Sequence, residues 1–459
     1  MTRNRDFKTL VRQRMAKTGE RYSTARTHVL AGRPPGDRSD KADATRSGRF
    51  PSVLTVGGQQ PDLAAARNLC TSAGVVGPDG TPMSEALAFG LAGGVGFLYG
   101  VFQYGDTPTM TIVARNQSMP DPFCEQLFRR LGLAVDISTT TGSKKAATDL
   151  DHALADGRPV LCTVGAGALP YLGLREGEAA MSPHLVGVVG VDGERSLLID
   201  DRSPTPIPVD RADLDRARAA YRQGKHRLVA VRVPGAGAGT GVGADAGSDV
   251  RADPDARFGL DWPVVLEAAV AEAVAGFNRP PVPRFASNVG LSGLGKWQEL
   301  LTSPTGKGWG AVFGEGQRAA IGLARLHDCI NNAYTTPDAG RPLFARFLEE
   351  GAEAARRPDW MEAARLWSES GRAWREMSDV VLSAHPDLEH YGRLSDQRSD
   401  ALDSGEPDPA AMAALTDEQH RLVEEFQFDR EQAGAVHRRL SEIVATIVEL
   451  ESQGLDLLR

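Results

Sequence analysis

The stretch PHLVGVVGVDGERSLLIDDR, residues 183–202, predicts two short strands joined by a tight turn. Both strand segments are apolar and largely β-branched, and Asp192-Gly193 between them favours a hairpin turn because these residues tolerate positive φ. His184 then lies on the first strand, and Asp201 follows the second. A carboxylate beside an imidazole orients its tautomer and stabilises the imidazolium. The hairpin therefore predicts an acid–base pair, and the alternative is a buried histidine near a turn-capping aspartate.

Two earlier segments add to this pattern. GGQQPDLAAARNL, residues 57–69, predicts the start of a helix with Pro61 in its first turn, where a backbone N–H has no helical partner. SEALAFGLAGGVGFLY, residues 84–99, predicts a helix that ends in a glycine-rich turn and continues as an aromatic strand. A further strand is expected at residues 159–164, followed by a Leu-Pro-Tyr segment that ends at Tyr171.

Taken together, these segments resemble the N-terminal domain of the butirosin-biosynthesis H protein family. In that family a His-Cys pair begins the first helix, a Ser-Glu-Ala segment leads into Phe-Gly-Leu and a glycine-rich Phe-x-Tyr stretch, and a later hairpin carries His and Asp. The resemblance implies a papain-like fold of the C39-peptidase type. It also implies transfer of an aminoacyl group from a carrier-protein thioester to an amine, with no cofactor beyond the phosphopantetheine of the donor. The matching positions are His184 and Asp201 for catalysis, and Glu85, Tyr99 and Tyr171 for substrate binding.

The expected nucleophile is missing from this alignment. Gln60-Pro61 stands where the family has His-Cys. Cys70 follows nine residues later on the same predicted helix, roughly 13 Å along its axis, and so cannot occupy the same site. Gln60 could supply an amide donor near an oxyanion and Asp62 a carboxylate, although either residue could instead belong to the turn or the helix cap.

The fold class that we expect is α+β, with a papain/C39-peptidase-like domain at residues 49–232 and an all-α helical domain at residues 256–459. Helical and strand patterns alternate in the first domain, whereas apolar residues recur at three- and four-residue spacing in the second. A short basic helical arm with a linker is expected at residues 1–48, and a Gly/Ala/Asp-rich linker at residues 233–255. The helical half resembles the domain that usually follows in the family, and its tryptophans could be core residues or line a cleft. Helices are expected at 266–277, 318–332, 343–355, 360–377, 408–427 and 430–453.

Charge and composition limit the partners. The net charge is −8, but residues 1–50 carry thirteen Lys/Arg against five Asp/Glu, so the arm is about +8 and the remainder about −16. We expect the arm to contact an acidic surface rather than nucleic acid, because no recognition motif accompanies it. The four cysteines show no metal-ligand spacing and are expected to be buried in a reducing cytoplasm, with no metal. No apolar run is long enough to span a membrane.

Three functional hypotheses follow from these residues. The first is an acyltransferase without a covalent intermediate, in which His184, oriented by Asp201, deprotonates an amine for direct attack on a thioester. The second is a catalytically inactive relative, a pseudoenzyme that binds a metabolite, a carrier protein or a sister enzyme. The third, a thiol peptidase or amidase, needs the absent nucleophile and ranks last. The sequence leaves the substrate and the oligomeric state open.

Overall fold

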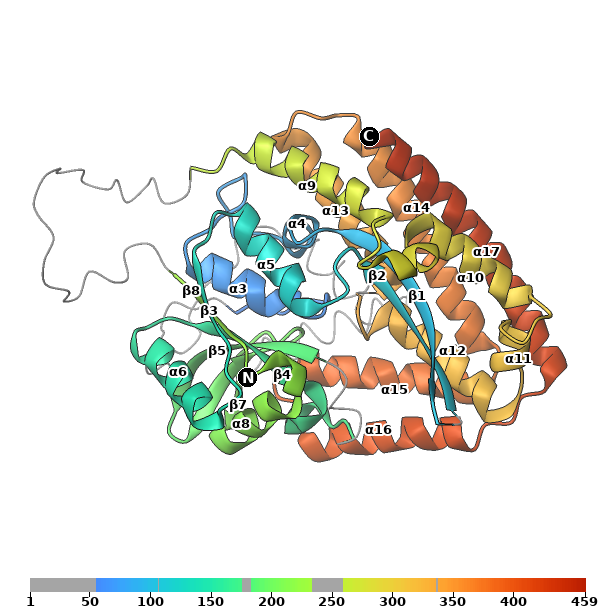
Figure 1. Ribbon diagram of the computed structural model, residues 1–459, viewed down its shortest axis with the longest axis horizontal. Coiled ribbons are helices and arrows are strands. Elements are labelled where there is room, and N and C mark those ends of the chain that lie inside the picture. Colours follow the sequence, from blue (N-terminus) through green and yellow to red (C-terminus); the bar gives the residue numbers. More distant parts are fainter. Residues whose placement is uncertain (1–54, 106, 176–182, 233–258, 336) are drawn as a thin grey trace, which may run out of the picture.

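The computed structural model describes residues 55–105, 107–175, 183–232, 259–335 and 337–459. The expected basic arm and the expected Gly/Ala/Asp-rich linker lie outside these residues. Figure 1 shows the strands and short helices of the N-terminal part beside a larger array of long helices. The predicted α+β region followed by an all-α region is confirmed.

The N-terminal part contains an antiparallel six-stranded sheet in the order β3-β8-β4-β5-β6-β7. The predicted hairpin forms strands β5 and β6, and Asp192 pairs with Arg195, so that Gly193, at φ 62°, lies in the turn between them. The helix predicted from residue 61 begins slightly later, and Pro61 precedes its N-cap, Asp62. The sheet strands are β3 (Val135–Ser138), β4 (Val160–Gly165), β5 (Pro183–Asp192), β6 (Arg195–Ile199), β7 (Ile207–Asp210) and β8 (Leu228–Val231).

Helices cover both faces of this sheet. Alternate residues of the central strands face opposite sides, so that Val186 and Val188 pack with α6 and α8, whereas Leu185 belongs to the core shared with α3 and α5. The helices of this part are α3 (Leu63–Ser72), α4 (Glu85–Leu91), α5 (Pro120–Arg130), α6 (Ser143–Ala155) and α8 (Arg211–Ala220), with short 3-10 turns η1 (Ala166–Ala168), η2 (Pro170–Leu172) and η3 (Arg222–Gly224).

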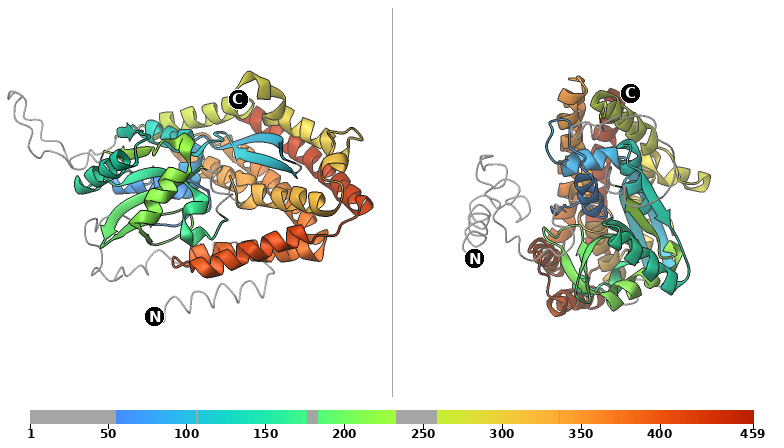
Figure 2. Two further views of the ribbon diagram at one scale, coloured as in Figure 1. Left: turned by 60° about the horizontal axis from the view of Figure 1, so that its bottom comes forward. Right: turned by 90° about the vertical axis from the view of Figure 1, so that its left-hand side faces the viewer.

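The aromatic strand predicted after residue 94 does not join this sheet. It forms a separate antiparallel hairpin of β1 (Val95–Tyr104) and β2 (Thr107–Arg115). Figures 1 and 2 show the hairpin lying against the long helices rather than against the six-stranded sheet. It packs on α10 and α12, so the hairpin contributes to the contact between the two halves of the chain.

The C-terminal part is entirely helical in its described residues. The six predicted helices are present with shifted ends, and two longer helices, α10 and α15, were not predicted as helices. The elements are α9 (Trp262–Phe277), η4 (Pro283–Asn288), α10 (Gly290–Thr302), α11 (Trp309–Val312), α12 (Gly316–Asn331), η5 (Pro337–Gly340), α13 (Arg341–Ala354), α14 (Trp360–Ser383), α15 (Pro386–Asp403), α16 (Pro409–Glu424) and α17 (Arg430–Leu457).

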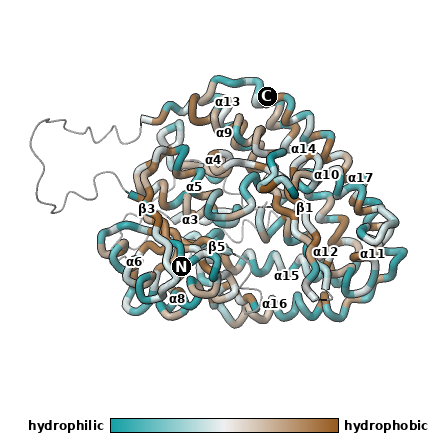
Figure 3. The backbone as a smooth tube through the Cα atoms, in the orientation of Figure 1, coloured by the Kyte–Doolittle hydropathy of each residue, from teal (hydrophilic) through white to brown (hydrophobic). Residues whose placement is uncertain are grey.

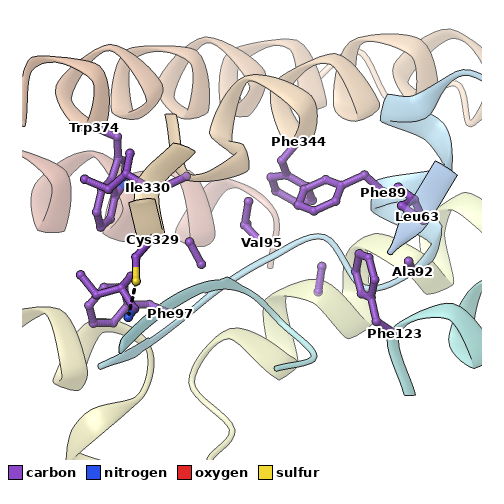
Figure 4. Close-up of a cluster of buried hydrophobic side chains, with 14 of the residues drawn as sticks. Leu63, Phe89, Ala92, Val95, Phe97, Phe123, Cys329, Ile330, Phe344 and Trp374 are labelled. Carbon is purple, nitrogen blue, oxygen red and sulfur yellow. Dashed lines mark hydrogen bonds between the residues drawn. The ribbon is translucent and has the colours of Figure 1, made fainter. Parts of the chain in front are cut away.

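One hydrophobic core crosses the expected domain boundary. Figure 4 shows Leu63, Phe89 and Phe123 in the same cluster as Phe344 and Trp374. Trp297, Trp367 and Trp374 are fully buried in it, as core residues rather than as the lining of a cleft. In Figure 3 the more hydrophobic residues concentrate where elements face one another.

No helix among the described residues has the length and apolar character needed to cross a bilayer.

Candidate functional site

The candidate site lies where three segments meet: the N-terminus of α3, the start of β5 and the end of β6. His184 is the second residue of β5, and 14% of its side chain is exposed. Its Nε2 lies 2.8 Å from Asp200 Oδ1, and its Nδ1 lies 3.5 Å from Asp62 Oδ1. Among the described residues, which exclude 176–182, both ring nitrogens of His184 therefore face carboxylates.

The carboxylate paired with His184 is Asp200, and the prediction that Asp201 orients the imidazole is wrong by one residue. Asp200 comes directly after β6, so it lies beside His184 across the hairpin. Successive residues of an extended chain point in opposite directions, and the Asp201 side chain instead accepts a hydrogen bond of 2.7 Å from the backbone N–H of Asp62. Periodicity alone could not decide between two adjacent aspartates at a strand end.

Tyr171 supports Asp200 from η2. Its hydroxyl donates a short hydrogen bond to Asp200 Oδ2, and the backbone N–H of Asp201 donates to Asp200 Oδ1 at 2.6 Å. Only 3% of Tyr171 is exposed. The expected substrate-binding residue is therefore a buried partner of the His184–Asp200 pair.

Asp62 is the residue that approaches His184 from the helix. It occupies the N-cap position of α3 in the left-handed conformation, with φ 70°, which aspartate adopts more readily than most residues, and its side chain makes no capping hydrogen bond to the helix. Its Oδ1 accepts from the backbone N–H of Leu185 at 3.1 Å, and its Oδ2 pairs with Arg115 Nη2 at 3.1 Å. Asp62 thus lies one residue beyond the position aligned with the family's cysteine. The sequence placed it at the helix start but held no sign of its contact with His184.

Gln60 and Glu85 build the loop before α3. Glu85 Oε1 accepts from the backbone N–H groups of Gln59 and Gln60 at 2.5 and 2.6 Å. The Gln60 side chain is fully buried, and its amide donates to the carbonyls of Pro61 and Tyr334 at 3.3 Å. The predicted oxyanion donor and the predicted substrate-binding glutamate therefore both hold backbone groups of this loop.

Tyr99, which was predicted to bind substrate, lies in the aromatic core and away from His184. Its ring stacks on Trp297 at a centroid distance of 5.8 Å, and its hydroxyl accepts a 2.8 Å hydrogen bond from Trp309 Nε1. Only 2% of the residue is exposed. The aromatic strand that carries it packs on the helical half, which the sequence pattern did not predict.

The charges of the network can be assigned from its contacts. Burial by itself lowers the pKa of His184, but the neighbouring carboxylates, Asp200 foremost, outweigh it and hold this pKa well above its usual value. Burial likewise opposes ionisation of Asp200, whose pKa is nevertheless lowered by the imidazolium. The pKa of Asp62 is also lowered, because His184 and Arg115 outweigh its burial.

Asp201 behaves in the opposite way. Burial and the adjacent Asp200 charge raise its pKa well above the usual range. In the rest of the network His184 lies beside Asp200 and Asp62, and Arg115 pairs with Asp62. Each basic group therefore faces at least one carboxylate, as buried charges require.

This arrangement limits the chemistry of His184. A general base needs an unprotonated nitrogen directed at its substrate. Here the imidazolium is held between two ionised carboxylates.

The ligand atoms of His184, Asp200 and Asp201 lie within 4.8 Å of one another, a spacing that a metal ion could use. These atoms are already engaged in the hydrogen bonds described above.

No cysteine of the chain is placed as an activated nucleophile. All four are buried, and burial raises the pKa of each thiol. Cys70 lies in the core along α3. Cys124, on α5, donates its S–H to the backbone carbonyl of Asp62 at 3.1 Å. The thiol nearest the helix start is thus a neutral hydrogen-bond donor.

Comparison with known families matches residues 63–202 to the family described as Butirosin biosynthesis protein H, N-terminal. The matched segment begins with α3 and includes His184, Asp200 and Asp201, and Asp62 immediately precedes it. The predicted resemblance is confirmed over these residues, whereas the resemblance of the helical half remains a prediction. No curated protein matches the chain.

Proposed function

We propose, from the match of residues 63–202 to the butirosin-H N-terminal family, that this protein serves specialised-metabolite biosynthesis as a binding member that forms no covalent acyl intermediate. The observation that carries this proposal is that both ring nitrogens of His184 face carboxylates, Asp200 at 2.8 Å and Asp62 at 3.5 Å. A nucleophilic triad would need a thiol or a hydroxyl on one side of the imidazole. Asp62 holds that side here.

The ligand class follows from the family resemblance. It is a metabolite, or the carrier-protein thioester that delivers one, bound by the protein without acyl transfer. The buried network of charged groups then stabilises the fold around α3, since removing one partner of a buried pair leaves an uncompensated charge.

The decisive test combines a transfer assay with a binding assay. Purified protein is mixed with aminoacyl and acyl phosphopantetheine carrier-protein thioesters and a panel of amines, and products are followed by mass spectrometry. Binding of the same acyl carrier proteins is measured by calorimetry. We expect binding without amide formation. Amide formation by the wild-type protein at a rate above the uncatalysed reaction would overturn the proposal.

A second candidate, direct acyl transfer, is favoured by one observation: the His184–Asp200 pair is intact at 2.8 Å and supported by Tyr171. In that reaction the amine nitrogen attacks the thioester carbonyl, the C–N bond forms, the C–S bond breaks, and the amine proton passes through the base to the leaving thiolate. It requires Asp62 to move away from Nδ1 and the imidazolium to lose its proton. His184→Ala would then lower turnover by about 10²- to 10⁴-fold.

A further inference from the structure

A second buried ion pair lies in the helical half and contacts the hairpin that leads to the site. Arg341, the first residue of α13, and Glu451, on α17, are both 0% exposed. Arg341 Nε and Nη2 donate to the two carboxylate oxygens of Glu451 at 2.7 and 2.8 Å. Glu451 Oε1 also accepts from Ser370 Oγ at 2.8 Å and from Trp374 Nε1 at 3.0 Å. This pair is fully desolvated and fully hydrogen bonded.

The remaining donors of Arg341 reach both strands of the β1–β2 hairpin. A guanidinium has five N–H groups. Beyond the two bonds to Glu451, Nη1 donates to the carbonyls of Ala114 and Ala339 at 2.8 and 2.9 Å, and Nη2 donates to the carbonyl of Gly96 at 3.1 Å. All five donors are therefore used, and two of them hold the end of the hairpin.

The backbone before Arg341 is strained. Asp338 and Ala339 have φ of 61° and 57°, and Gly340 follows at 74°. Left-handed backbone costs a non-glycine residue on the order of 1–3 kcal/mol when it persists, and it persists only where the surroundings hold it. Asp338 is paired with Arg375 of α14. The turn that presents Arg341 is thus held from both sides.

The hairpin end connects directly to the site. Arg115 follows Ala114, and its side chain is 1% exposed. Arg115 Nη1 donates to the carbonyl of Pro61 at 3.1 Å, and Nη2 pairs with Asp62 at 3.1 Å. Backbone packing here is close, since a Cβ on Gly96 would lie 2.7 Å from the Arg115 carbonyl. A displacement of the hairpin end would therefore carry Arg115 with it.

We propose that Arg341 and Glu451 are positioning residues of the His184 site: they hold the end of the β1–β2 hairpin so that Arg115 keeps Asp62 against the imidazole. This proposal rests on the proposed function because it concerns the same site. It gives the helical half the role of holding Asp62 and Arg115 in place. The groups that face His184 and its partners are Asp62, Asp200 and Asp201, with Arg115 and Tyr171 behind them. Of these, Asp62 and Arg115 depend on the hairpin.

The test is a titration of His184 by NMR in the full-length protein labelled on histidine, with the signal assigned by its loss in His184→Gln. Glu451→Gln removes the charge that holds Arg341. Arg341→Lys keeps a charge opposite Glu451 but cannot reach the carbonyls of Gly96 and Ala114 together. We expect the midpoint of the His184 titration to fall by about one pH unit in either variant, because an opposite charge moves away from the ring.

Leu440→Ala is the matched control, since Leu440 is fully buried on α17 but is not one of the groups that bind Arg341. It should lower the stability of the helical half and leave the titration unchanged. An unchanged titration in a folded Arg341→Lys, or an equal shift in Leu440→Ala, would overturn the proposal. If Glu451→Gln does not fold, Arg341→Lys decides alone. The titration is read without any acyl donor, so its outcome is separate from that of the transfer assay.

Discussion

Asp62 Oδ1 lies 3.5 Å from His184 Nδ1, while Asp200 Oδ1 lies 2.8 Å from Nε2 of the same ring. The imidazole thus has a carboxylate at each nitrogen, with Arg115 and Tyr171 behind the two acids. In a catalytic triad one ring nitrogen faces the orienting acid and the other faces the nucleophile. Here Asp200 is the orienting acid, and Asp62 takes the place of the nucleophile.

Asp62→Asn should destabilise the protein by about 3–5 kcal/mol near pH 6, because it leaves the buried Arg115 charge without its partner. The raised pKa of His184 contributes stability that is fully present below its unfolded value of about 6.5 and is lost as the pH rises through the folded pKa. The loss of unfolding free energy in Asp62→Asn should therefore become smaller above the folded pKa of His184, where the ring is no longer charged and gains less from Asp62. Denaturant unfolding over a pH series measures both effects.

The control for this prediction is Asp149→Asn, which removes a surface ion pair with Lys145. Such pairs contribute at most about 1 kcal/mol. Equal stability losses in the two variants would contradict the assignment of Asp62 to a buried network.

Tyr171→Phe should lower the free energy of unfolding by about 1.5–3 kcal/mol at neutral pH, the range for a hydrogen bond to a charged group. Tyr221→Phe is a suitable comparison, because the Tyr221 hydroxyl makes only a 3.5 Å contact with Gln223. If the two substitutions cost the same in urea unfolding, Tyr171 does not support an ionised Asp200.

The cysteines should resist alkylation in the native protein. Their thiols are buried and their pKa values are raised, so little thiolate is present at neutral pH. Iodoacetamide should label none of them within minutes at pH 7, whereas all four should be labelled after denaturation, as counted by intact mass. Rapid native labelling of Cys124 would show an accessible thiolate beside Asp62.

His437 should make the protein less stable in acid. It is buried against Trp309, and burial lowers its pKa to about 4. Since the folded pKa lies below the unfolded value, the unfolded chain binds the extra proton first, and stability falls as the pH drops from about 6.5 towards 4, by up to about 1.4 kcal/mol per pH unit. Its Nε2 is buried without a hydrogen-bond partner.

His437→Leu removes both the titrating group and the unpaired nitrogen. The difference in unfolding free energy between this variant and the wild type should grow in favour of the variant as the pH falls from 6.5 to 4. A difference that does not change with pH would rule out a neutral, buried His437.

Local pattern was sufficient for some of these features. The hairpin of β5 and β6 followed from β-branched strands around Asp192-Gly193, and the long helices followed from their apolar spacing. These properties depend on neighbouring residues, so they can be recognised along the chain. Helix α15 was not predicted, because its apolar residues form only a weak stripe that packs in the context of α14 and α16.

From the sequence we could predict the hairpin that carries His184, six of the helices of the C-terminal part and the resemblance of the N-terminal part to the butirosin-H family. Which aspartate contacts each nitrogen of His184 depends on the three-dimensional packing, because Asp200 and Asp201 are adjacent and identical in the sequence and differ only in the direction of their side chains. The same packing places Tyr99 in the aromatic core. It also brings Arg341, 279 residues beyond Asp62, into contact with strand β2, whose last residue, Arg115, pairs with Asp62. Contacts between distant residues depend on packing and desolvation, which no local pattern records.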